Sequence, residues 1–121
     1  MHPNFQKAME LTGTIINAAI EVHRDKAPGL VESIYEWCLE KELEIRGFPF
    51  QRQKTVVITY KGFAREEPLL VDDSLLVEAK SVLKVLPIHK AQLLSYMKLL
   101  DVPVGLVINF NDLNYWMVCT V

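Results

Sequence analysis

A glutamate and a lysine two residues apart, Glu78 and Lys80, are the side chains of this sequence best suited to chemistry. They end the apolar run Leu75-Leu76-Val77, which predicts a strand over residues 75–80. Because side chains alternate across a strand, both project from one face, with α-carbons ~6–7 Å apart. Two interpretations follow. Either Glu78 ligates a hard divalent cation while Lys80 stabilises an attacking water or a phosphate oxygen, or the two form a structural ion pair at an exposed strand end.

The cysteines and histidines do not predict a metal or redox site. Cys38 and Cys119 belong to no C-x-x-C pair, so we expect two core thiols. The histidines stand apart from one another and form no H-E-x-x-H motif.

The formal net charge of −2 conceals an uneven distribution of charged residues. Residues 1–44 carry four basic and eight acidic groups, whereas residues 45–65 carry five basic groups and no acid. Residues 66–78 then carry five acids and no base, and residues 79–100 carry four lysines and no acid. Two basic blocks around an acidic one are compatible with a phosphate-binding surface, but charge alone favours ordinary solvated faces of helices and strands.

Apolar periodicity predicts eight elements in the order α, α, β, β, β, α, β, β. The ranges are about 5–24 and 30–46 for the first helices, 55–60, 63–71 and 75–80 for three strands, 87–101 for a helix, and 104–109 and 115–121 for two strands. Asn4 is expected to cap the first helix, and 72–74 to form a tight turn. The faces expected to be buried are Val31, Ile34, Tyr35, Cys38, Leu39 and Leu43 on the second helix, and Ile88, Ala91, Leu94 and Leu99 on the third.

The length and composition predict one domain over residues 1–121 with an α/β fold and a mixed central sheet. No apolar run is long enough for a membrane span, and Lys7 and Glu10 interrupt any signal-peptide core. We therefore expect a cytoplasmic protein that has no membrane partner and no small-molecule cofactor.

Four ordered blocks of the sequence resemble the GxxExxY family, a group of small bacterial proteins with the PD-(D/E)XK nuclease-like fold. The blocks are Gly29-Leu30-Val31-Glu32-Ser33-Ile34-Tyr35, residues 75–81, residues 86–99 and residues 105–110. The resemblance implies an α-β-β-β-α-β core over 29–110, an extra N-terminal helix over 1–28, and an altered C-terminal segment over 111–121.

The resemblance also implies a site that gathers around Mg²⁺ and a scissile phosphate. Glu32 would be the carboxylate of the helix before the sheet, Glu78 a metal ligand and Lys80 the charge near the nucleophilic water. Gln92 and Tyr96, four residues apart on one helical face, would orient the substrate or a metal-bound water. Other roles are open: Glu32 as a helix cap, Tyr96 and Tyr35 as core aromatics, and Gly29 as a chain-reversal residue.

One departure from the family pattern affects a residue that is expected to bind the metal. The pattern expects an aspartate on the second strand where this sequence has Pro68, and the link from Gly62 to Leu69 looks about four residues short. Asp72 and Asp73 would sit at the wrong end of the hairpin, so Glu66 is the stand-in metal ligand that we consider.

The function expected from the resemblance is Mg²⁺-dependent hydrolysis of phosphodiester bonds in DNA or RNA. The alternative, prompted by Pro68, is a catalytically inactive module of the same fold that binds nucleic acid or protein. A third interpretation is a homo-oligomer that associates through the apolar C-terminal segment, residues 115–118.

Overall fold

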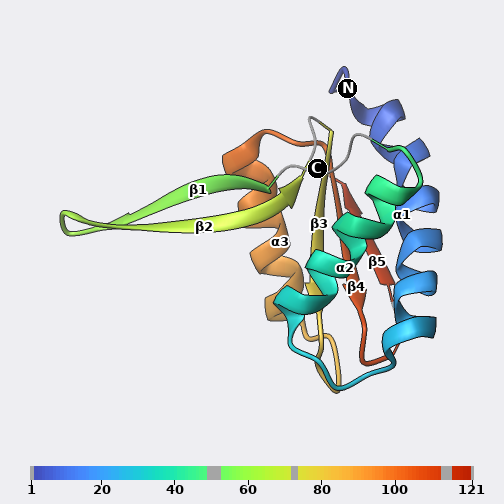
Figure 1. Ribbon diagram of the computed structural model, residues 1–121. Coiled ribbons are helices and arrows are strands. Elements are labelled where there is room, and N and C mark those ends of the chain that lie inside the picture. Colours follow the sequence, from blue (N-terminus) through green and yellow to red (C-terminus); the bar gives the residue numbers. More distant parts are fainter. Residues whose placement is uncertain (1, 49–52, 72–73, 113–115, 121) are drawn as a thin grey trace.

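A single mixed sheet runs through the centre of the molecule (Figure 1). The computed structural model describes residues 2–48, 53–71, 74–112 and 116–120. Within these ranges the elements are α1 (Phe5–Lys26), α2 (Glu32–Ile45), β1 (Gln53–Tyr60), β2 (Phe63–Val71), β3 (Leu75–Lys80), α3 (Pro87–Leu100), β4 (Val104–Asn109) and β5 (Trp116–Thr120). The predicted α/β fold, with the α-β-β-β-α-β core preceded by an extra helix, is confirmed.

The strands lie in the order β1-β2-β3-β4-β5. The β3–β4 pair is parallel, while the β1–β2, β2–β3 and β4–β5 pairs are antiparallel. The parallel pair requires α3 as its crossover connection, because parallel strands cannot be joined by a tight turn. Both central strands are buried on both faces, as their continuous apolar sequences predict.

Alternate residues of the central strands contribute to two separate cores. Leu75, Val77 and Ala79 of β3 pack with α1 and α2 on one face of the sheet. Leu76, on the opposite face, packs with Leu93 and Met97 of α3. The domain therefore has three layers, and the alternation places Glu78 and Lys80 on the same face as Leu76, toward α3.

The buried faces predicted for the second and third helices are partly wrong. On α2, Tyr35, Leu39 and Leu43 are buried as expected, and Cys38 is partly buried, but Val31 and Ile34 are exposed. On α3, Ile88, Ala91 and Leu99 are exposed, Leu94 is partly buried, and the buried residues are Leu93 and Met97. Apolar residues surround α3 on all sides, so their spacing could not identify the inward face.

The face of α3 is decided by a glycine on the neighbouring strand. A Cβ at Gly105 would lie 2.6 Å from Met97 Sδ and 2.9 Å from Leu93 Cδ2. The helix therefore approaches β4 as closely as the missing side chain permits, with Leu93 and Met97 directly over the glycine. This contact sets the position of α3, and with it the position of Gln92.

The helix ends agree only in part with the expectations. Asn4 occupies the N-cap position of α1, as predicted, but its side chain makes no capping hydrogen bond to the helix. Gly47, which follows α2, has a positive φ of 77°, and Pro87 starts α3; both were predicted. The turn expected at 72–74 falls mostly on residues outside the described ranges, as does Tyr115 at the start of the last strand.

The β1–β2 hairpin projects from the rest of the molecule (Figure 1). Its strands pair with each other from Gln53 and Leu70 to Tyr60 and Phe63. In contrast, the described pairing of β2 with β3 takes in Leu70 and Val71 alone. Residues 57–66, which form the outer part of the hairpin, are exposed.

Candidate functional site

Glu78 and Lys80 lie side by side at the carboxyl end of β3. Lys80 Nζ is 3.6 Å from Glu78 Oε2, and both side chains are largely withdrawn from solvent. The expected projection of the two groups from one face of the strand is therefore observed. The arrangement is a largely buried ion pair, which differs from the exposed structural pair considered as an alternative.

The carboxylate of Glu78 is buried without compensation by hydrogen bonds. Glu78 is 8% exposed, and among the described residues neither Oε1 nor Oε2 has a hydrogen-bond partner. Burial raises the pKa of Glu78, the charge of Lys80 opposes this shift, and the like charges of Glu32 and Glu36 add to it. Buried carboxylates in proteins are normally paired or bound to a metal. The Glu78 carboxylate has Lys80 as a counter-charge, but within the described ranges its two oxygens accept no hydrogen bond, an arrangement that also fits a cation.

Gln92 holds the ammonium group of Lys80 from the other side. Lys80 Nζ donates a hydrogen bond to Gln92 Oε1 over 3.1 Å, which links β3 to the second turn of α3. An ammonium group has three donors, so these two contacts leave capacity for a further acceptor. The ammonium group of Lys80 is therefore held in one orientation and can still donate a hydrogen bond to one further acceptor.

Glu32 joins the start of α2 to the end of β3. Its Oε2 accepts a hydrogen bond from the backbone N–H of Ser81 over 2.9 Å. Glu32 is also the first residue of α2, where a negative charge is favourable. The structure thus brings Glu32 next to the Glu78–Lys80 strand end, and its carboxylate is tied to the sheet rather than capping its own helix.

Glu36 is a residue of this cluster that the sequence analysis did not identify. It is four residues after Glu32 on α2, is partly buried, and contributes to the raised pKa of Glu78. The signal was available, because residues four apart lie on one face of a helix. A carboxylate at that spacing from the glutamate of the motif is expected to face the same site.

Gly29 and Tyr35, the other residues of the motif, position Glu32 rather than act in the site. The hydroxyl of Tyr35 donates to the carbonyl of Ala27 and accepts from the N–H of Leu30 over 3.2 Å. Its ring stacks on Phe110 with centroids 4.6 Å apart. Gly29 has a φ of 114°, which side chains disfavour. The interpretation of Tyr35 as a core aromatic and of Gly29 as a chain-reversal residue is confirmed.

Asn109 fixes the chain that leaves Lys80. Its Oδ1 accepts hydrogen bonds from the N–H groups of Val82 and Asn111, and its Nδ2 donates to the carbonyl of Val82 over 2.9 Å. Lys80 O accepts from the N–H of Phe110 over 2.7 Å. The end of β3 and the next two residues are therefore held to the end of β4, where Asn109 is buried.

Glu66 lies apart from this cluster, whereas Tyr96 follows Gln92 on α3. Glu66 is exposed on β2, in a stretch whose described pairing is with β1 alone, roughly 13 Å along the strand from Leu70. Tyr96 packs, partly buried, against the core beneath α3, one turn beyond Gln92. Pro68 pairs through its backbone position with Thr55.

The described residues contain no group of three or more His, Cys, Asp or Glu side chains already arranged to hold a metal. Mg²⁺ does not require such a group, because it keeps several waters and is bound through one or two carboxylates together with substrate phosphates. Glu78 supplies one such carboxylate, and the charges of Glu32 and Glu36 reach it from α2. A hollow of about 630 Å³, lined by residues 29–33, Ser81 and Asn111, opens beside Glu32.

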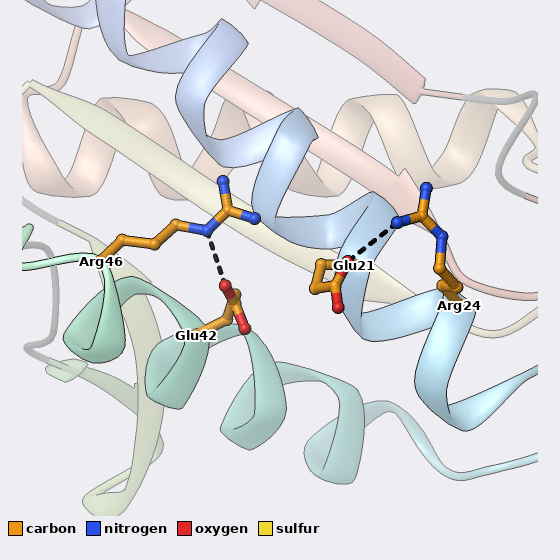
Figure 2. Close-up of polar contacts among 4 residues, drawn as sticks. All are labelled: Glu21, Arg24, Glu42 and Arg46. Atoms are coloured by element: carbon orange, nitrogen blue, oxygen red, sulfur yellow. Dashed lines mark hydrogen bonds and ion pairs between the residues drawn. The ribbon is translucent and has the colours of Figure 1, made fainter.

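Much of the remaining surface charge is neutralised locally. Figure 2 shows Arg46 turned toward Glu42 and Arg24 toward Glu21, each pair about one helical turn apart. The contacts are 2.6 Å from Arg46 Nε and 3.1 Å from Arg24 Nη1. For these residues the interpretation as solvated helix faces is the right one.

The fold and the strand-end cluster together define a nuclease-like domain. The chain matches the sequence pattern of the PD-(D/E)XK nuclease superfamily over residues 9–117 and belongs to that superfamily. Comparisons with curated proteins and with solved structures found no significant match. Among the described helices, none has the length and apolar character needed to cross a bilayer.

Proposed function

We propose that this protein is a GxxExxY-type nuclease that hydrolyses phosphodiester bonds of DNA or RNA with the help of Mg²⁺. The observation that carries the proposal is the buried carboxylate of Glu78. Its oxygens accept no hydrogen bond from the part of the chain that the structure describes, and it lies beside an ammonium group held by Gln92. Membership of the nuclease superfamily supports the reaction class.

In this proposal each residue at the end of β3 has a distinct task. Glu78 holds the cation together with Glu32 or Glu36, so that α2 supplies the carboxylate missing at Pro68. Bound Mg²⁺ would supply Lewis-acid activation of the phosphate. Lys80 directs its remaining N–H donors toward a phosphate oxygen, where its charge is strengthened by the low local dielectric. Gln92 keeps the ammonium group in that direction.

Loss of hydrolysis in a Glu78→Gln variant tests this proposal. The amide keeps the shape of the side chain but removes the negative charge that would bind the cation. We expect cleavage of labelled single-stranded or double-stranded DNA or RNA by the wild type with Mg²⁺ or Mn²⁺, abolition by EDTA, and a loss of about 100-fold or more in the variant. The exposed Glu10 of α1 supplies the matched control, since Glu10→Gln makes the same chemical change far from β3 and should cleave normally.

The competing function is a nucleic-acid-binding or protein-binding module without catalysis, and Pro68 at the aspartate position favours it. Its signature would be nucleic-acid affinity that falls steeply with salt but is indifferent to EDTA. Absence of cleavage on every substrate, or equal cleavage by the Glu78→Gln protein, would contradict the proposed nuclease.

A further inference from the structure

The outer part of the β1–β2 hairpin is a two-stranded ribbon with solvent on both faces (Figure 1). An isolated hairpin is marginally stable in water, and this one exposes four large apolar side chains. They are Val57, Ile58, Tyr60 and Phe63. A surface of this kind on a projecting element is typical of a binding site rather than of a solvated loop.

The two faces of the ribbon differ in composition. Tyr60 is paired with Phe63, and Ile58 with Arg65, so these four side chains share one face. The opposite face carries Thr59 with Ala64, and Val57 with Glu66. The first face therefore holds both aromatic rings and an arginine, while the single acid of residues 57–66 lies on the other.

The turn brings the rings and a second cation together at the tip. Lys61 and Gly62 both have positive φ, 47° and 87°, which produces a tight two-residue hairpin turn. Tyr60 and Phe63 are consequently direct neighbours across the strands, 69% and 78% exposed. Lys61 Nζ lies 5.4 Å from the centroid of the Tyr60 ring.

We propose that this aromatic face binds single-stranded nucleic acid, with bases stacked on Tyr60 and Phe63 and phosphates contacted by Lys61 and Arg65. Exposed rings between cations match the stacking and backbone contacts by which proteins hold unpaired strands. The choice of nucleic acid as the ligand rests on the proposed nuclease function. What the hairpin adds is a second contact region, on a projecting element separate from the Glu78–Lys80 strand end.

Charge favours nucleic acid over a second copy of the chain as the occupant. Residues 45–65 carry five basic groups and no acid, and two of these groups, Lys61 and Arg65, lie on the exposed ribbon. An apolar partner surface would have to desolvate both cations, which is costly, whereas a polyanion offers them phosphates.

Fluorescence anisotropy with a labelled oligothymidylate of about 15 nucleotides, at low salt and in EDTA, tests the inference on the full chain. Tyr60→Ala combined with Phe63→Ala should weaken binding about tenfold or more, because two stacking surfaces are lost. Tyr60→Phe combined with Phe63→Tyr keeps both rings and should bind like the wild type. Lys61→Gln should lower the slope of log K against log salt by about 0.7.

The matched control is Val57→Ala, which truncates an apolar side chain on the opposite face of the same hairpin and should leave affinity unchanged. Circular dichroism establishes that each variant is folded. The inference would be overturned if Val57→Ala and the double alanine variant lost oligonucleotide affinity equally. It would also be overturned if the double alanine variant lost no affinity. Sedimentation velocity showing that the double alanine variant abolishes self-association while oligonucleotide affinity is unchanged would overturn it as well.

This experiment separates the hairpin from the proposed reaction. Because binding is measured in EDTA, it does not depend on cleavage. Metal-dependent cleavage with normal binding by the double alanine variant would reject the hairpin and leave the nuclease standing. Oligonucleotide binding that depends on the hairpin, in a protein that cleaves no substrate, would reject the nuclease and leave the hairpin site standing.

Discussion

A buried carboxylate without hydrogen-bond partners reduces the stability of a folded protein, and Glu78 is such a group. Lys80 offsets only part of the cost, since desolvation is the largest influence on the pKa of Glu78 and raises it. A strand end built purely for stability would surround the carboxylate with donors or replace it by an apolar residue. The arrangement is better explained by a ligand that completes it.

The raised pKa of Glu78 predicts a particular pH dependence of folding. Because the folded state raises the pKa of Glu78, it binds that proton more tightly than the unfolded chain does, and stability contributed by Glu78 is lost as pH rises through the raised pKa. The free energy of unfolding of the wild type, minus that of Glu78→Gln, should therefore fall as the pH rises above the ordinary pKa of a glutamate.

Urea unfolding in EDTA, followed by tryptophan fluorescence at each pH, measures this difference. Lys80 also loses its partner in the Glu78→Gln variant, so the sign of the difference at one pH is uninformative and its trend is the test. A difference that stays constant, or that grows with pH, would show that burial does not disfavour the ionised carboxylate.

The chemically distinctive residues could be predicted from the sequence, but their full set could not. Glu32, Glu78, Lys80 and Gln92 stand in recognisable local patterns, and the structure brings them to one strand end. Glu36 is one helical turn after Glu32 on α2, a spacing that the sequence also contains. Glu66 was considered because it is near Pro68 in sequence, whereas the hairpin directs it elsewhere.

At the scale of elements, strand positions were predicted well because apolar and β-branched runs differ clearly from the flanking turns. Helix faces were predicted less well. The apolar residues of α3 surround the helix, and the inward face depends on where Gly105 of β4 allows close approach. That information lies in the parallel pairing of β3 with β4, which no local pattern contains.

Gly105→Ala should accordingly destabilise the fold by about 1–3 kcal/mol, because the new methyl group would overlap Met97 and Leu93. In a background of Met97→Ala, where space is available, the same substitution should cost less, so that the two changes are not additive. Urea denaturation of the four proteins measures the coupling. A neutral Gly105→Ala, or strict additivity, would contradict the packing of α3 described above.

At the scale of the whole molecule, acidic helices and basic segments occupy different regions. The helical layer of α1 and α2 carries most of the acids and pairs several of them internally (Figure 2). Basic groups in stretches without any acid lie on the outer hairpin, at Lys61, and around α3, at Lys84, Lys90 and Lys98. The net charge of −2 therefore does not describe the surface that a polyanion would meet.

The C-terminal segment was expected to favour association between copies. In the structure β5 pairs with β4 at one end of the sheet order, and Trp116 and Val118 of β5 are exposed. Association through this edge stays a prediction. The hairpin carries the larger exposed apolar surface of the two, which could not be predicted, because alternation locates a strand but does not show that β2 leaves the sheet.

In the function proposed above, the buried Glu78 carboxylate, paired with Lys80, binds a divalent cation. Calorimetric titration of the metal-free protein with Mn²⁺ tests it most directly, since metal binding is measured without any assumption about substrate. We predict one binding site in the wild type, binding weakened about tenfold or more by Glu78→Gln, and normal binding by Glu10→Gln. Unchanged Mn²⁺ binding by Glu78→Gln, or no binding by the wild type, would contradict the claim.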